Sequence, residues 1–381
     1  QMKSCLVSQG GEVTARGRAA ALGHVYLALN TTGRKRFLEM LAEDFDIDEK
    51  SVDAAVKNLR KSTDKESRYK AQTSLKKSLI APRIKLLTQF NALPDGVKFL
   101  VDMRGELISI NSNEPAMRGL EYDLREILSS WFDVDFLELR QITWDNATAA
   151  LLEKLIAYEA VHAINGWDDL KNRLDSDRRC FAYFHPRIPD EPLIFVEVAL
   201  VNGLEGSIQN LLDEDAPVLD TLDANTAIFY SISNAQKGLA GISFGNFLIK
   251  RVANSLSNEC KGLKTFATLS PAPGFMTWLN KNLDENKPNF LSLRESKVLK
   301  DLSQKGDTPE QTLKLLLRNH SWQNNKVISE ALRLPLMRLC AHYLINEKGI
   351  KNRTLDPVAH FHLTNGAQME KLNWQGDLST K

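Results

Sequence analysis

Hydrophobic and polar residues follow two different patterns along the chain, and the change falls near residue 160. In the first 160 residues, apolar residues recur at spacings of three and four positions, the pattern of helices with one buried face. Ser51 is the expected N-cap of one of these helices. We therefore predict an all-helical domain over residues 1–160. Its clearest helices are expected over residues 19–29, 34–45, 52–59, 120–128 and 149–161.

Beyond residue 160 the apolar runs are shorter and richer in aromatic and β-branched residues, as in strands. Residues 179–184 and 193–201 flank the proline-rich segment 185–192, which predicts two antiparallel strands joined as a hairpin. We predict that residues 161–381 form an α+β domain around a central sheet. Its other expected elements are strands over residues 226–232, 262–269 and 358–363, and helices over residues 239–257, 309–317 and 327–346.

Composition and charge exclude several classes of function. The 381 residues are 43% hydrophobic, and 49 basic side chains oppose 48 acidic ones, leaving a net charge of +1. Such a balance provides no global field for a polyanion, so nucleic acid is not expected as a partner. The longest apolar run, residues 192–201, contains Glu197 and is too short to cross a bilayer. Residues 1–11 lack the pattern of a signal peptide. We expect a cytoplasmic protein without membrane contact.

Neither the cysteines nor the longest basic run is expected to form a functional site. The four cysteines lie far apart, without a C-x-x-C pair or a nearby histidine cluster, so reduced thiols and no metal site are predicted. Asp64 and Glu66 interrupt the basic run, which favours a solvated helix face over a docking surface. The run consists of Lys57, Arg60, Lys61, Lys65, Arg68, Lys70, Lys76, Lys77, Arg83 and Lys85.

A glycine-bearing turn follows the predicted strand 226–232 and leads into a helix. The amide groups at a helix N-terminus are unpaired and carry partial positive charge, so such a turn can bind a phosphate. Gly238, Gly241 and Gly245 do not form G-x-G-x-x-G, and no G-K-[ST] follows. Phosphate binding and simple close packing of the turn are therefore equally compatible with this spacing.

Two further segments carry candidate chemistry. Ser270 ends a predicted strand within Leu-Ser-Pro-Ala-Pro-Gly-Phe, where the prolines would hold its hydroxyl at the sheet edge. It does not lie in a G-x-S-x-G nucleophile turn. Strand alternation would place His360 and His362 on one face, where a histidine can donate a proton near neutral pH. Considered singly, Ser270 is better explained as a turn cap, and most of the seven histidines are expected to be structural or exposed.

Together these segments are similar to one family. Residues 231–252, 269–275 and 361–367, in this order and at this spacing, resemble malonyl-CoA decarboxylase. The resemblance implies a helical N-terminal domain that forms a dimer or tetramer, then a catalytic domain of the N-acetyltransferase fold with a mixed sheet. It also implies malonyl-CoA as substrate, with no cofactor besides the coenzyme A of the substrate and no metal. The catalytic pair it implies is Ser270 and His362, and the malonyl-CoA segment is Ala240, Gly241, Ile242, Ser243, Phe244, Gly245 and Asn246.

The chain departs from the resembled patterns at two positions. Acetyltransferase turns usually begin with Gln or Arg three residues before the first glycine, where this chain has Ala235. Pyrophosphate contacts are therefore assigned to backbone groups alone. The animal decarboxylases have an acidic residue at the place of Ser243, so no carboxylate is assigned to orient His362. Family members also continue for some tens of residues past the position of Lys381.

The expected reaction converts malonyl-CoA and a proton to acetyl-CoA and carbon dioxide. Ser270 would hold the malonyl carboxylate out of the thioester plane, and His362 would protonate the carbon left behind. One alternative is an acyl-CoA-dependent N-acetyltransferase of the same fold, which would require an amine acceptor. The other is a non-catalytic protein that binds coenzyme A and assembles through its helices, for which substitution of Ser270 or His362 would be without effect.

Overall fold

The structure is a computed structural model that describes residues 11–90, 93, 95–242, 245–285, 287–288, 290–303 and 307–379. The chain forms two compact units. The first comprises Gln1–Ala163, Phe181–Phe195 and Ser233–Arg251, and the second comprises Ile164–Cys180, Val196–Ile232 and Val252–Lys381. No helix in the described ranges is long and apolar enough to cross a membrane.

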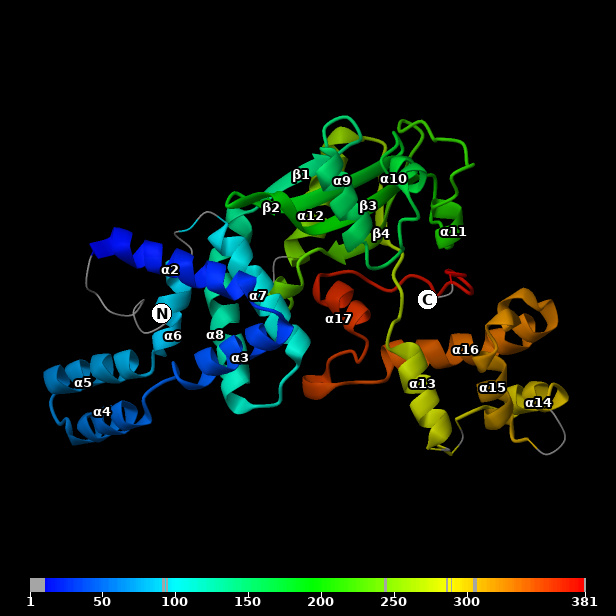
Figure 1. Ribbon diagram of the computed structural model, residues 1–381. Helices are drawn as coiled ribbons and strands as arrows, with labels where there is room; N and C mark the ends of the chain where they lie inside the picture. Colours follow the sequence, from blue (N-terminus) through cyan, green and yellow to red (C-terminus); the bar gives the residue numbers. More distant parts are fainter. Residues whose placement is uncertain are drawn as a thin grey trace. The chain divides into compact units, whose positions relative to one another are not determined.

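Helices make up most of the first unit (Figure 1). They pack around buried aliphatic and aromatic side chains such as Leu38, Leu87, Leu100 and Leu124, each nearly inaccessible to solvent. The apolar spacing of the sequence thus faces inward, as in any amphipathic bundle. The helices are α2 (Gly11–Ala28), α3 (Thr31–Glu43), α4 (Glu49–Lys61), α5 (Lys65–Ser78), α6 (Pro82–Phe90), α7 (Gly96–Ile110), α8 (Pro115–Trp131) and α9 (Ala149–Tyr158), with the short η1 (Val134–Phe136) and η2 (Lys237–Leu239).

The second unit has its own helical cluster, drawn in yellow to red in Figure 1. Trp278, Leu299, Leu313, Leu339 and Tyr343 belong to its buried core. The helices that surround this core come from consecutive stretches of chain, so the cluster is built from contacts local in sequence. The helices of this unit are α10 (Trp167–Arg173), α11 (Ile208–Leu211), α13 (Phe275–Asp284), α14 (Leu293–Asp301), α15 (Pro309–Arg318), α16 (Lys326–Ile345) and α17 (Pro357–Thr364), with η3 (His320–Asn324) and η4 (Ile350–Asn352).

The sheet has five strands in the order β1-β2-β3-β4-β5. Only two residues, Pro186 and Arg187, separate β2 from β3, so this pair is an antiparallel hairpin. β4 and β5 pair in parallel with Phe229 opposite Thr268, and α12 (Gly245–Glu259) connects them. The sheet is therefore mixed. Its strands are β1 (Glu138–Ile142), β2 (Arg178–His185), β3 (Ile188–Val201), β4 (Thr226–Asn234) and β5 (Thr265–Thr268).

The predicted α+β class and mixed sheet are confirmed, and five local predictions are wrong. The hairpin connection expected over residues 185–192 is shorter, because β3 already begins at Ile188. β1 lies within residues 1–160, which were expected to be entirely helical. The helix expected from residue 239 begins at Gly245, because η2 and a connection precede it. The N-cap of α4 is Asp48 rather than Ser51, and Ser51 donates its own hydroxyl to Asp48. Residues 358–363, expected as a strand, belong to helix α17.

Candidate active site

Ser270 lies directly beyond the carboxyl end of β5. The Leu269 amide donates to the carbonyl of Phe229 over 3.0 Å, which extends the parallel pairing by one residue. The Leu269 side chain packs against the buried cluster that contains Ile228 and Tyr230. Pro271 then prevents continuation of the strand. The exposed Ser270 side chain is thus held at the sheet edge, as the sequence predicted.

His362 lies near the end of helix α17. Asp356 caps this helix, because its carboxylate accepts from the amides of Val358 and Ala359 at 3.0 Å each. Pro357 occupies the first turn, where its missing N–H costs nothing. Gly366, at φ +90°, turns the chain after the helix, and its amide donates to the carbonyl of Leu363. Helix α17 is too short to be stable by itself, so these caps stabilise it.

Ser270 and His362 meet although 92 residues separate them in the chain. Ser270 Oγ and His362 Nε2 lie 3.0 Å apart and form a hydrogen bond. The imidazole is half-buried, and this burial lowers its pKa below the ordinary 6.5. The neutral ring therefore predominates at pH 7 in the free protein. A hydroxyl and an imidazole in direct contact can together orient an anionic substrate and transfer a proton.

The expectation for His360 is wrong. His360 and His362 were placed on one face of a strand, but residues two apart on a helix differ by about 200° in direction. The structure brings only His362 to Ser270. His360 thus offers a matched control on the same helix.

The malonyl-CoA segment inferred from the resemblance falls on a connection and a helix N-terminus. Ala240, Gly241 and Ile242 connect η2 to α12, which begins with Gly245 and Asn246. Gly241 adopts a left-handed φ of +76°, and open space surrounds the position of a Cβ. Ser243 and Phe244 lie outside the described residues.

A buried arginine holds the chain just before this segment. Arg104 of α7 is 2% exposed, and its guanidinium donates to the carbonyls of Gly238 at 2.6 Å and Ala240 at 2.9 Å. Glu121 of α8 accepts from the same guanidinium at 2.6 Å. Arg104 could not be predicted from the sequence, since no local pattern relates it to residues more than 130 positions later.

Gly238 allows this close approach. A Cβ at Gly238 would lie 1.7 Å from the carbonyl oxygen of Val101, a backbone atom that cannot turn aside. A Cβ added at Gly105, which faces the same turn, would lie 3.4 Å from the Gly238 amide nitrogen. Gly238 is therefore required for packing. Close packing is one of the two explanations that the sequence leaves open for this turn.

Gln236 follows Ala235, which stands where acetyltransferase turns usually have Gln or Arg. The Gln236 side chain has a structural role. It is buried, and its side-chain amide donates to the carbonyl of Pro192 over 3.1 Å. A side chain engaged in this way is directed at the neighbouring strand. The assignment of pyrophosphate contacts to backbone groups alone stays a prediction.

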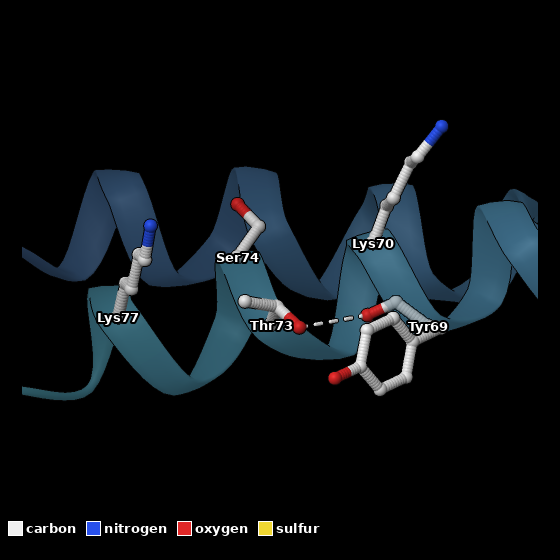
Figure 2. A pocket seen from close by; sticks show the side chains of 5 residues that line it. All are labelled: Tyr69, Lys70, Thr73, Ser74 and Lys77. Atoms are coloured by element: carbon white, nitrogen blue, oxygen red, sulfur yellow. Dashed lines mark hydrogen bonds between the residues drawn. The ribbon is translucent and has the colours of Figure 1, made fainter.

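The basic run lies on α4, α5 and the start of α6. Nine of its ten side chains are exposed, as predicted for a solvated face, and the exception is Arg83. Arg83 is buried and forms ion pairs with Asp46 and Asp123. Figure 2 shows a pocket beside α5. Lys70, which lines it, forms an exposed ion pair with Glu66 of the same helix. The pocket is lined by Tyr69, Lys70, Thr73, Ser74 and Lys77.

Metal-ligating side chains do not cluster in the described part of the chain. No group of three or more His, Cys, Asp or Glu residues there is arranged to hold a metal ion. Cys180, Cys260 and Cys340 form no disulfide among the described cysteines. The absence of a cofactor remains a prediction.

Comparison with known proteins decides the family. A family model described as the malonyl-CoA decarboxylase C-terminal domain matches residues 135–381, and its N-terminal counterpart matches residues 45–132. The chain belongs to the malonyl-CoA decarboxylase family. Mitochondrial malonyl-CoA decarboxylase of the goose Anser anser anser is 36% identical over 96% of this chain and 75% of its own length. The enzyme of Rattus norvegicus is 35% identical, over 96% and 77%.

Solved structures of the family share the fold. Malonyl-CoA decarboxylase from Rhodopseudomonas palustris superposes with a TM-score of 0.88 at 38% identity, covering 100% of this chain and 87% of that one. The Agrobacterium vitis enzyme gives the same TM-score and identity, covering 100% and 88%. The relatives are carboxy-lyases by name, so the expected enzyme class is confirmed at the level of the family.

Proposed function

We propose that this chain decarboxylates malonyl-CoA to acetyl-CoA with Ser270 and His362 as its catalytic residues. The observation that carries the proposal is the 3.0 Å hydrogen bond between Ser270 Oγ and His362 Nε2. It joins the two motifs whose combination resembles the family, and nothing local in the sequence requires them to meet. Family membership supplies the substrate class, and the contact supplies a pair of groups suited to it.

The chemistry requires charge stabilisation and one proton. The bond between the α-carbon and the carboxylate breaks, carbon dioxide leaves, and the electron pair moves into the thioester as an enolate. Ser270 donates a hydrogen bond to the malonyl group and holds its carboxylate out of the thioester plane. The bound carboxylate favours the protonated imidazole of His362, which then gives its proton to the α-carbon. Solvent restores the proton.

The coenzyme is assigned to residues 240–246. The left-handed Gly241 leaves space above the chain, and the N-terminus of α12 provides amide groups and a partial positive charge suited to a pyrophosphate. Homo-oligomer formation through the helical residues 1–160 and a cytoplasmic location belong to the same proposal.

Two substitutions test the catalytic assignment. Ser270→Ala and His362→Asn should each lower kcat about a hundredfold or more, the usual loss on removing one preorganised donor or acid. Carbon dioxide release from malonyl-CoA is measured without any amine present, which also separates decarboxylation from acetyl transfer. His360→Asn is the matched control and should retain normal turnover. Near-normal kcat in both active-site variants would refute the assignment.

A further inference from the structure

Asp356 does more than cap the helix that carries His362. The residue is fully buried, and its two carboxylate oxygens accept four hydrogen bonds. Oδ1 accepts from the amides of Val358 and Ala359 in α17. Oδ2 accepts from the Gly274 amide and the Tyr343 hydroxyl, each at 3.2 Å. One carboxylate thus joins α17, the loop after β5 and helix α16.

The loop that Asp356 holds is the loop that carries Ser270. Gly274 follows Ser270 by four residues, and Pro271 and Pro273 lie between them. Each proline fixes its own φ, so the short loop has little freedom to move Ser270 once Gly274 is held. Asp356 in turn precedes His362 by fewer than two helical turns. The Ser270–His362 contact and the Gly274–Asp356 contact therefore join the same two segments at both ends.

Tyr343 connects this arrangement to the core of the second unit. Burial and the nearby Asp356 charge raise the pKa of Tyr343 to about 12, so its hydroxyl remains a donor. Its ring lies 5.4 Å from that of Trp278 and 6.0 Å from that of Phe275, between centroids. A Cβ added at Gly274 would lie 2.1 Å from the Tyr343 hydroxyl oxygen. Only glycine therefore permits the observed approach.

A cap alone does not require these contacts. Asp48 and Asp64 cap α4 and α5 from exposed positions, and their carboxylates accept from residues of the helix that each one caps. The second oxygen of Asp356 instead accepts from Gly274 and Tyr343, which lie outside α17. This arrangement fixes the position of Ser270 relative to His362.

We infer that Asp356 is a positioning residue for decarboxylation, holding Ser270 and His362 at reacting distance through Gly274 and the first turn of α17. The inference rests on the proposed roles of Ser270 and His362. It places Asp356 outside contact with the substrate, so its loss should affect turnover and leave binding intact.

Asp356→Asn tests the inference. The Asn oxygen can still accept from the α17 amides, but its NH₂ group cannot accept from Gly274. We expect kcat to fall about tenfold to hundredfold, as for a reacting group displaced by up to 1 Å, with an unchanged KM for malonyl-CoA. Asp48→Asn is the matched control, because it makes the same change of charge at a helix cap elsewhere and should leave kcat unchanged. Normal kcat in Asp356→Asn, or a raised KM with normal kcat, would overturn the inference.

Two further variants separate the possible failures. If Asp356→Asn does not fold, Tyr343→Phe decides: a severalfold lower kcat at constant KM supports the inference, and normal kcat overturns it. His362→Asn is assayed alongside. Normal turnover in His362→Asn refutes the proposed catalytic role of His362, on which the inference rests. Inactive His362→Asn together with fully active Asp356→Asn refutes only the positioning role.

Discussion

Two segments of this decarboxylase are each held by one buried charged residue from a distant part of the chain. In the first unit, Arg104 holds the start of the proposed coenzyme segment and the turn before it, from 134 and 136 residues earlier. In the second unit, the loop after Ser270 is held by Asp356, from 82 residues later. Each segment also contains a glycine pressed against its neighbour, Gly238 in one case and Gly274 in the other.

The opposite charges of the two residues have different consequences. A guanidinium can only donate, so Arg104 binds carbonyl oxygens and competes with no ligand for the amide donors that an anionic phosphate needs. A carboxylate can only accept, so Asp356 binds amide and hydroxyl groups and supports a segment whose exposed group is a serine hydroxyl. We therefore expect changes near Arg104 to alter KM and changes near Asp356 to alter kcat.

The two glycines provide the largest expected effects. Gly238→Ala would bring a methyl group 1.7 Å from a backbone oxygen, so the turn must move, at a cost of about 3 kcal/mol. KM for malonyl-CoA should rise strongly, with little change in kcat for the enzyme that still binds. Gly274→Ala instead meets a side-chain hydroxyl, and kcat should fall while KM is retained. Steady-state kinetics and thermal unfolding measure both.

A second substitution should rescue only one of them. Tyr343→Phe removes the atom nearest to the new methyl group, so Gly274→Ala/Tyr343→Phe should recover part of the lost thermal stability relative to Gly274→Ala. No side-chain change can relieve the contact at Gly238, because its neighbour is backbone. If the Gly238 variant lost kcat and kept KM, the proposed division between binding and turnover would be wrong.

Arg104→Lys gives the next largest effect. The lysine keeps the charge beside Glu121 but cannot hold both carbonyls in the fixed fork of a guanidinium. KM should rise about tenfold, corresponding to the loss of about one hydrogen bond to a charged group, while kcat changes little. Lys98→Arg, on the same helix and more exposed, is a suitable control. Equal KM values for Arg104→Lys and the unmodified enzyme would show that Arg104 does not support the proposed coenzyme segment.

Sequence patterns predicted the position of Ser270 well and that of His362 poorly. Ser270 could be placed because a short β-rich run followed by two prolines has few other interpretations. Residues 358–363 were assigned to a strand from a brief alternation that a short helix also shows. The caps contained the correct signal: Asp356-Pro357 begins a helix, and Asn365-Gly366 ends one.

The residues that hold the site could not be predicted from the sequence. Arg104 and Glu121 resemble any charged pair on a helical domain until tertiary packing buries them. Asp356 shows only its cap role locally, and its contact with Gly274 depends on how helices α13, α16 and α17 pack. Local patterns report secondary structure, whereas these contacts arise from long-range packing.

The smallest expected effect concerns pH and stability. Burial lowers the pKa of His362 in the second unit and of His185 in the first, so the unfolded chain binds more protons just below pH 6.5. Stability is therefore fully present above pH 6.5 and declines as pH falls through the lowered pKa values of the folded state. Denaturant unfolding at pH 7.5 and pH 5.5 should show a smaller decline for His362→Asn than for His360→Asn. Part of the decline should persist in His362→Asn, because buried His185, bonded to the Trp131 carbonyl, still titrates. Identical declines in the two variants would show that His362 is not buried enough to affect folding.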